Sequence, residues 1–396
     1  MTLTVRIKTL TPLWTGGLDG TMDRLHETGI IGSLRWWYEA IVRGLGGSAC
    51  DPTGDHRCPD KNGKYCDVCA VFGATGLQRA FRLEGPVWWN KLRGRSLTVR
   101  VKNNKGWFLR HGYLGEDKMQ VIPLRLPEGW SLEDLTHSLY LIMKLIECWG
   151  GLGPKTQVGY GVVRFNCEKK NEENNKIELN IEQAIKAIQN FQKRNKRRNI
   201  TDKKRPTLNE FFFVKVRFSI SNQDIQTWLK KWKQKIKVTF EPSSELDWYL
   251  NYFVVPLSSI IRYYLRSFVH SNLTKSKEAR HKLMGTLRQR SLIHISQAYP
   301  IGTPNQWEFR IWGWVPDSLP GGVTRDTVLD RLHQWLGISQ DVSQKGQWHL
   351  AKNGQLWQSL DLPDPKVCWL EKETHEKTAD FLRRLLNTCE CKKEAA

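Results

Sequence analysis

The order of the apolar patterns in the first 167 residues is the feature that most restricts the fold. Residues 3–10 (LTVRIKTL) alternate with a period of two, which predicts a strand, and a helix follows. Two strand-like runs, a second helix and a final strand complete the series: Arg79–Leu83, Leu97–Lys102, Leu132–Trp149 and Gly161–Cys167. This β-α-β-β-α-β order predicts an α+β domain of the ferredoxin-like (RRM-like) kind.

The pattern starts again after Pro206. It predicts a strand at 211–220, two helices, a strand pair and a further helix: Ile225–Ile236, Trp248–Phe268, 290–299, 307–315 and Thr327–Leu336. Beyond Ser339 it predicts only a helix at Thr374–Leu386. Because this order resembles the first, we expect two ferredoxin-like domains in tandem, although the two halves show no direct sequence repetition.

These patterns predict three parts. Residues 1–168 form an N-terminal domain with a Cys-rich insert at about 47–75, residues 169–208 a helix and basic linker, and residues 209–396 a diverged C-terminal domain with a helical tail. The linker helix is expected at Ile181–Phe191 and ends in a basic run, QKRNKRRNITDKKRP. This run is either a solvated tail or a contact for the backbone of a nucleic acid.

The charge of the chain favours a polyanionic partner. Lys and Arg number 61 against 40 Asp and Glu, giving a formal charge of +21, and there are 18 tryptophans. Phosphates neutralise such charge and bases stack on such rings, which suits nucleic acid. The N-terminus lacks the continuous apolar stretch of a signal peptide, and Lys144 and Glu147 interrupt the longest apolar segment. We therefore expect a soluble cytoplasmic protein without a membrane partner.

Residues 29–47, GIIGSLRWWYEAIVRGLGG, predict a helix over Leu34–Leu45, with Ser33 as its N-cap and Gly46-Gly47 at its end. The apolar residues at helical spacing define its buried stripe: Leu34, Trp37, Tyr38, Ile41 and Leu45. On the opposite face lie Arg35, Glu39 and Arg43. Trp36 either covers the edge of the core or lies beside a phosphate bound at the helix N-terminus.

Four of the nine cysteines lie close together in CDPTGDHRCPDKNGKYCDVC: Cys50, Cys58, Cys66 and Cys69. The Cys66-x-x-Cys69 pair has zinc-knuckle spacing, and intervening turn residues allow the other two thiolates to complete a tetrahedron. Four sulfur ligands predict a structural zinc site, with His56 as a substitute ligand. The alternative is four unrelated thiols in a loop. We interpret the other cysteines as core or incidental.

A glycine-rich stretch, GGLGPKTQVGYGVVRF (150–165), carries a helix end into a strand, with Lys155 and Thr156 at its tip. It is not a P-loop, because no Gly-Lys-Ser/Thr opens a helix. Glycines there allow the backbone to approach a ligand closely, and Val158–Phe165 half-matches an RNA-recognition strand. A plain tight turn is the alternative.

Four segments together resemble the RAMP superfamily of CRISPR-associated proteins: TPLWTGG (11–17), the 29–47 segment, CAVFGATGLQRAFRL (69–83) and GGLGPKTQVGYG. The nearest resemblance is to the first subunit of type III-B (Cmr) effector complexes. It implies two ferredoxin-like domains and an RNA-guided antiviral ribonucleoprotein containing guide RNA, target RNA and other RAMP subunits. It also implies a non-cutting subunit near the 3′ portion of the guide that helps to capture the target.

The two glycine segments are predicted to line one RNA-binding groove, because the first and last strands of such a sheet are neighbours. The predicted RNA-binding residues are Gly32, Ser33, Arg35, Trp36, Arg43, Gly153, Lys155, Thr156 and Gly159. Family members commonly carry arginines where this chain has Lys155, Gln157 and Val158.

Two alternatives remain open. His26, with Arg24 and Lys155 as phosphate neutralisers, would act as general acid/base in a metal-independent endoribonuclease that processes guide RNA. The second alternative is an assembly protein that does not touch RNA, which fits the tryptophan content but not the charge.

Overall fold

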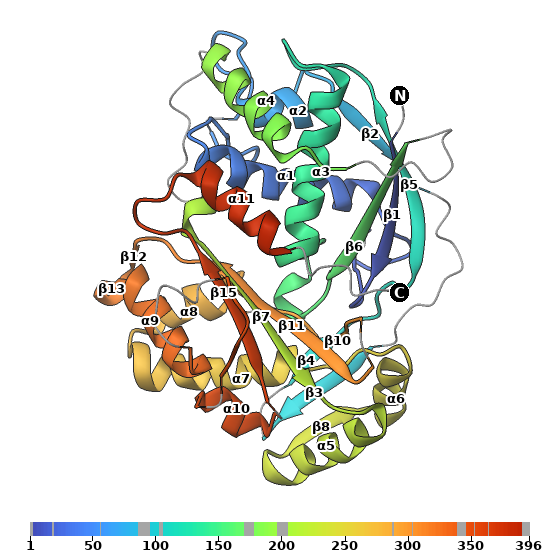
Figure 1. Cartoon of the computed structure of the whole chain (residues 1–396), viewed down its shortest axis with the longest axis vertical. Helices are drawn as coiled ribbons and strands as arrows, with labels where there is room; N and C mark the ends of the chain where they lie inside the picture. Colours follow the sequence, from blue (N-terminus) through green and yellow to red (C-terminus); the bar gives the residue numbers. More distant parts are fainter. Residues whose placement is uncertain are drawn as a thin grey trace.

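In the computed structural model of the chain, antiparallel sheets and the helices that cover them form an α+β fold (Figure 1). The structure describes residues 3–17, 20–55, 57–85, 96–102, 106–169, 178–195, 205–286, 289–302, 304–338, 346–351, 353–362 and 364–389. The predicted α+β class is confirmed. Among the described residues, none of the helices combines the length and the apolar character that crossing a membrane requires.

The first sheet contains four antiparallel strands in the order β2-β5-β1-β6. Their bounds are β1 (Leu3–Thr9), β2 (Phe81–Glu84), β5 (Glu116–Pro123) and β6 (Val163–Lys169). The helices of this half are α1 (Glu27–Gly44), α2 (Asp67–Phe72) and α3 (Leu132–Trp149), followed by the short 3-10 turn η1 (Thr156–Val158). β1 is central, and its alternate residues Leu3, Val5 and Ile7 are buried because successive side chains point to opposite faces.

One strand of the first sheet differs from the prediction. Leu97–Val101 does form a strand, β3, but it pairs with β4 (Trp107–Leu109) and β8 (Val238–Glu241) in a separate sheet of order β4-β3-β8. β5 takes its predicted place. β5 escaped prediction because its only buried residues, Met119 and Val121, form a very short alternation behind a charged start.

The second large sheet has the order β10-β11-β7-β15-β14, and β9 also pairs with β11. Its strands are β7 (Phe211–Ser219), β9 (Ile293–Ile295), β10 (Tyr299–Pro300), β11 (Gln306–Trp314), β14 (His349–Leu350) and β15 (Lys366–Glu371). The predicted strand at 211–220 and the predicted strand pair are confirmed, whereas β15 was not predicted. When four strands of each half are numbered in chain order, the two sheets share one arrangement, which is second, third, first, fourth. It is β2-β5-β1-β6 in the first half and β9-β11-β7-β15 in the second.

Helices separate and cover these strands (Figure 1). They are α4 (Ile181–Arg194), α5 (Asn222–Lys235), α6 (Ser243–Asn251), α7 (Ser258–Phe268), α8 (Lys277–Met284), α9 (Arg325–Leu336), α10 (Gln355–Leu360) and α11 (Thr378–Cys389). Short pieces complete the chain: η2 (Leu208–Glu210), η3 (Val269–Leu273), β12 (Ser318–Leu319), η4 (Pro320–Gly322) and β13 (Val323–Thr324). The single helix predicted at Trp248–Phe268 is instead two, α6 and α7. Pro256 lies between them, and proline disfavours helical backbone at the residue before it.

α1 begins seven residues earlier than predicted, at Glu27 rather than Leu34, so the predicted N-terminus at Ser33 is wrong. His26 is the N-cap residue, and its backbone N–H donates to Thr15 Oγ1 at 2.8 Å. A Cβ at Gly29 would lie 2.9 Å from the Thr15 side chain. Gly29 therefore permits close packing inside the helix rather than marking a boundary. The predicted stripe does face the core, since four of its residues are buried and Leu45 packs partly buried against them.

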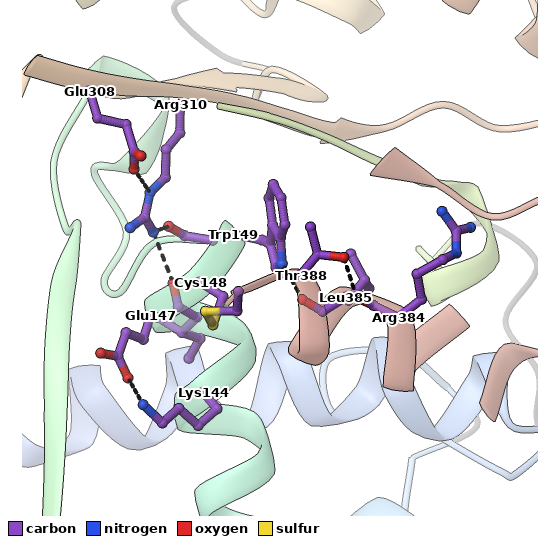
Figure 2. The surroundings of a disulfide bond; sticks show 12 residues. Lys144, Glu147, Cys148, Trp149, Glu308, Arg310, Arg384, Leu385 and Thr388 are labelled. Atoms are coloured by element: carbon purple, nitrogen blue, oxygen red, sulfur yellow. Dashed lines mark hydrogen bonds and ion pairs between the residues drawn. A yellow bond between two sulfur atoms is a disulfide. The ribbon is translucent and has the colours of Figure 1, made fainter. Parts of the chain in front are cut away.

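A disulfide joins the two halves of the chain. Cys148 at the end of α3 is bonded to Cys389 at the end of α11, with Cα atoms 5.3 Å apart (Figure 2). Beside it, Trp149 Nε1 donates to the Leu385 carbonyl at 2.7 Å. Cys148 is a buried core residue, as the sequence predicted, but its bond to Cys389 was not predicted. The two cysteines are 241 residues apart in sequence, so no local pattern pairs them. Cys167 and Cys368 are both buried.

Candidate metal centre and nucleic-acid interface

The four clustered cysteines converge on one buried point. The Sγ atoms of Cys50, Cys58, Cys66 and Cys69 all lie within 4.8 Å of one another. Cys66 is the N-cap of α2, where its sulfur accepts a hydrogen bond from the Cys69 backbone N–H at 3.4 Å. The Sγ atoms of Cys50 and Cys69 are 3.5 Å apart. Zn–S bonds of about 2.3 Å place tetrahedral sulfurs roughly 3.8 Å apart, so this arrangement fits a metal such as zinc.

Hydrogen bonding among these sulfurs favours partial ionisation of the cluster. The contact with Cys58 raises the pKa of Cys50, but contacts with Cys66 and Cys69 lower it to about 7. The contact with Cys50 lowers the pKa of Cys58 to about 7 and raises that of Cys69. Thiolates are the form that binds metal, so the donor set suits a soft divalent cation. The substitute ligand His56 lies outside the described residues.

Arg35 faces this cluster rather than open solvent. Its Nη2 donates to Cys69 Sγ at 3.2 Å, its Nη1 to the Gly73 carbonyl at 3.0 Å and its Nε to Glu39 at 3.0 Å. The guanidinium therefore connects α1 to the cysteine loop and places positive charge beside the thiolates. This position does not fit the predicted phosphate contact.

Arg43 is buried, with only 4% of its side chain exposed. Its Nη1 donates to the Pro206 carbonyl and its Nη2 to Glu39 Oε2, both at 3.2 Å. The predicted polar face of α1 is thus packed against the rest of the protein, because Glu39 pairs with both arginines. The phosphate role predicted for Arg43 does not fit this burial.

The glycine loop after α3 meets α1 as the groove prediction requires. The backbone N–H of Gly153 donates to Ser33 Oγ at 3.1 Å. Gly161 has φ +83°, and a Cβ there would lie 1.9 Å from the Leu152 carbonyl oxygen, so only glycine fits. Gly32 is exposed with open space around it, and Trp36 is half-buried with its ring 5.7 Å from that of Phe211.

The far side of the glycine loop is held by the second half of the chain. Ser258 Oγ and Gln297 Nε2 both donate to the Val158 carbonyl at 2.8 Å. Thr156 Oγ1 lies 2.9 Å from His294 Nδ1, and the Gly159 carbonyl accepts from the Gln297 backbone N–H at 3.1 Å. Thr156 and Gly159 are buried in these contacts, which does not fit their predicted exposure to RNA.

Lys155 stands at the tip of the loop. Its Nζ lies 4.8 Å from the centre of the Trp14 ring, a cation–π contact. Burial lowers the pKa of Lys155, and the positive charges of Arg110 and Arg290 lower it further. Within the part of the chain that the structure describes, Lys155 has no carboxylate partner. Sequence reasoning missed Arg110 and Arg290, which come from separate segments.

His26 and Arg24, the residues of the nuclease alternative, each pair with a carboxylate. His26 Nε2 lies 2.6 Å from Asp23 Oδ1, and the hydrogen bond with His26 lowers the pKa of Asp23. Arg24 Nη1 lies 3.0 Å from Glu27 Oε2. Most of the basic run at 192–206 lies outside the described residues, and Arg205 at its end pairs with Asp51.

Residues 6–164 match the model of the RAMP superfamily, which identifies the N-terminal part of the chain as a RAMP-superfamily domain. The resemblance read from the sequence is confirmed there. Cmr1 from Pyrococcus furiosus in its apo form is 11% identical, with 83% of this chain and 95% of that one covered and a TM-score of 0.36.

A chain of a type III-B Cmr-beta structure bound to cognate target RNA is 12% identical, covering 79% and 94% of the two chains with a TM-score of 0.39. A chain of a type IV-B CRISPR complex is 15% identical over 43% and 92%, with a TM-score of 0.28. No curated protein matches the sequence.

Proposed function

We propose that this protein is an RNA-binding, non-cutting subunit of a type III-B CRISPR RNA-guided effector (Cmr) complex. In this proposal it lies near the 3′ portion of the guide RNA, contacts other RAMP subunits and helps to capture target RNA. The RAMP-superfamily match over residues 6–164 supports the class, and the resemblance of the four sequence segments supports the type III-B assignment.

The observation that carries RNA binding is the position of Lys155. It combines a loop tip, an aromatic neighbour and the lack of a carboxylate partner among the described residues. A phosphate group supplies the missing counter-charge, and the formal charge of +21 requires many such partners.

The RNA-binding set retained from the sequence comprises Gly32, Ser33, Trp36, Gly153 and Lys155. These residues are half-buried or exposed around the contact between α1 and the glycine loop. Arg43, Thr156 and Gly159 are buried, and Arg35 is hydrogen-bonded to Glu39, Gly73 and Cys69. These four residues are therefore left out of the set.

We also propose that Cys50, Cys58, Cys66 and Cys69 hold one structural zinc ion. Four sulfurs fill a tetrahedral shell and leave no position for substrate, so the metal would stabilise the loop after α1 rather than take part in chemistry. Arg35 would act on this centre through its hydrogen bond to Cys69.

The two large sheets support a tandem arrangement. We infer that residues 1–168 and 209–396 contain diverged copies of the ferredoxin-like unit, joined by 169–208. The support is the strand order that both sheets share.

Binding of a labelled single-stranded RNA between 50 and 200 mM salt tests the RNA proposal. The wild type should lose affinity steeply with salt, and Lys155→Gln should reduce the slope of log K against log salt by about 0.7. Lys231→Gln, which removes an exposed charge from α5, is the matched control. Wild-type binding that does not depend on salt contradicts RNA recognition. Discrete cleavage products formed without metal and lost in His26→Ala would favour the nuclease instead.

A further inference from the structure

The positive charge around Lys155 continues across the junction between the two halves. We define the cationic belt as Arg110, Lys155, Arg290, Arg262, Arg266 and Arg280. Arg110 follows β4, and Lys155 lies in the glycine loop of the first half, whereas the other members belong to the second half around α7 and α8. Arg110, Arg266 and Arg290 are exposed, Arg280 is half-buried, and Arg262 is buried.

Neighbouring members of the belt lie close enough to repel one another. Arg110 and Arg290 both lower the pKa of Lys155, after burial. After burial, Arg266 lowers the pKa of Arg262, and Arg280 lowers that of Arg266. Like charges therefore follow one another from the first half into the second.

Backbone carbonyls hold the side chains of Arg110, Arg262 and Arg266 in place. Arg262 Nη2 donates to the carbonyls of Gln157 at 2.6 Å and Ile293 at 2.9 Å, which ties the glycine loop to β9. Arg266 Nη2 donates to the Gly285 carbonyl at 2.8 Å, and Arg110 Nη1 to the Gly20 carbonyl at 3.2 Å. A carbonyl fixes the direction of a guanidinium but leaves its charge uncompensated.

Within the described segments, no carboxylate oxygen lies within 4.0 Å of a side-chain nitrogen of the belt. Arginines elsewhere differ in this respect: Arg217 lies 3.0 Å from Glu308, and Arg384 lies 2.7 Å from Glu376. The protein thus pairs arginines with acids in other places but leaves this row without them. An anionic partner would supply the missing counter-charge to the exposed members of the row.

Aromatic rings accompany the belt. Tyr263, next to Arg262 on α7, is half-exposed, and Lys102 Nζ lies 5.8 Å from its ring centre. At the other end, the ring under Lys155 belongs to Trp14, which is buried, so Tyr263 is the ring that is open to a base. Cations interleaved with aromatic rings are the arrangement that single-stranded nucleic acid uses, with phosphates on the charges and bases near the rings.

We propose that a single RNA strand crosses the junction between the two halves along the cationic belt, with Arg110 and Arg290 binding phosphates on either side of Lys155 and Arg266 and Arg280 extending the path over α7 and α8. This inference rests on the proposed RNA-binding function and adds the second half to the binding surface. The proposed occupant of the belt is therefore an RNA strand rather than an acidic protein surface.

Three double variants of the full chain test the path with a fluorescein-labelled 20-nucleotide oligouridylate. Arg110→Gln with Arg290→Gln removes charge beside the loop, and Arg266→Gln with Arg280→Gln removes it on α7 and α8. Lys231→Gln with Lys235→Gln removes two exposed charges from α5 as the matched control. Each belt variant should reduce the salt slope by about 1.4 and affinity about 25-fold at 0.1 M salt, because each lost single-strand phosphate contact contributes about 0.7 to the slope. The control should change neither.

A second measurement uses the wild-type protein, so that the path can be tested when a belt variant folds poorly. Wild-type protein cross-linked to RNA containing 4-thiouridine should yield modified peptides from 263–280 and 289–302. Wild-type binding that persists unchanged in both belt variants overturns the path while leaving the proposed function standing. Belt variants that keep RNA affinity but fail to join other subunits assign the belt to an acidic protein surface, which also overturns it. A wild type that binds no RNA contradicts the proposed function itself.

Discussion

The indole Nε1 of Trp37 donates a hydrogen bond to the carbonyl oxygen of Gly151 at 3.2 Å. Trp37 is 1% exposed, and its ring centre lies 5.4 Å from that of Phe211 and 6.4 Å from that of Phe213 on β7. One side chain of α1 therefore fixes the start of the glycine loop and packs against the central strand of the second half.

Replacing Trp37 by alanine should destabilise the protein strongly. Loss of this buried ring and its cavity predicts a fall of about 3–5 kcal/mol in the free energy of unfolding. Urea denaturation measures it, with the half-buried Trp36→Ala as the control expected to lose less. The orientation described for α1 is contradicted if Trp36→Ala proves the more destabilising change.

Trp36 itself should matter for RNA. If its partly exposed ring stacks on a base, Trp36→Ala weakens single-stranded RNA binding by about 1–3 kcal/mol. Fluorescence anisotropy at fixed salt measures the loss, and Trp36→Phe should restore part of it. An unchanged affinity in a folded Trp36→Ala protein places the bases elsewhere.

The purified chain should contain about one zinc ion, measured by elemental analysis. Cys66→Ser should release the metal and destabilise the loop after α1, because three sulfurs no longer complete the shell. Cys167→Ser is the control, since Cys167 is buried outside the cluster. A folded, metal-free wild type with four titratable thiols in this cluster is the result that rejects the site.

Under oxidising conditions Cys389→Ser should lower the free energy of unfolding by about 2–5 kcal/mol, because the Cys148–Cys389 bond closes a long loop. Adding a thiol reductant should bring the wild type to the stability of the variant. Peptide mapping without reduction should recover the two cysteines in one linked species. Equal stability of both proteins under oxidising conditions contradicts this expectation.

Acid should weaken the clamp around the glycine loop through His294. Burial lowers the pKa of His294 to about 3, with Arg262 and Arg290 adding to the effect. An unfolded histidine titrates near 6.5, so the unfolded chain binds the proton more readily. The contribution of neutral His294 to the free energy of unfolding is complete above about pH 6.5. Below that pH it falls by up to about 1.4 kcal/mol per pH unit.

Urea denaturation of the wild type and His294→Gln at pH 5, 6, 7 and 8 measures this effect. The difference in unfolding free energy between the two proteins should shrink as the pH falls below 6.5, because only the wild type has to protonate this histidine. A constant difference over that range would exclude His294 as the titrating group.

Local sequence signals predicted the elements that carry complete boundary signals. α3 has its predicted bounds because Ser131 and Asp134 form a capping box and Gly150 follows its last residue. α1 was misjudged because Gly29 and Ser33 imitate a helix start. Their actual contacts are with Thr15 and Gly153, residues far from them in the chain.

Partners distant in sequence explain the remaining differences at the site. The cysteine spacing predicted a cluster that the structure confirms, since all four lie within twenty residues. The burial of Arg43 depends on Pro206, and the cationic belt joins positions from 110 to 290, so no local window contains either. β5 and β15 become recognisable as strands only beside the strands that complete them.

The pairing of β3 with β8 makes each half of the chain depend on the other for a complete sheet. A fragment ending at 168 would retain β3 but lose β8, leaving a row of unpaired backbone groups at an open edge. Such edges recruit foreign strands and promote aggregation. If the halves were expressed separately, or if one half were exchanged between related genes, another strand would have to pair with this open edge. Without that pairing the product would not stay monomeric.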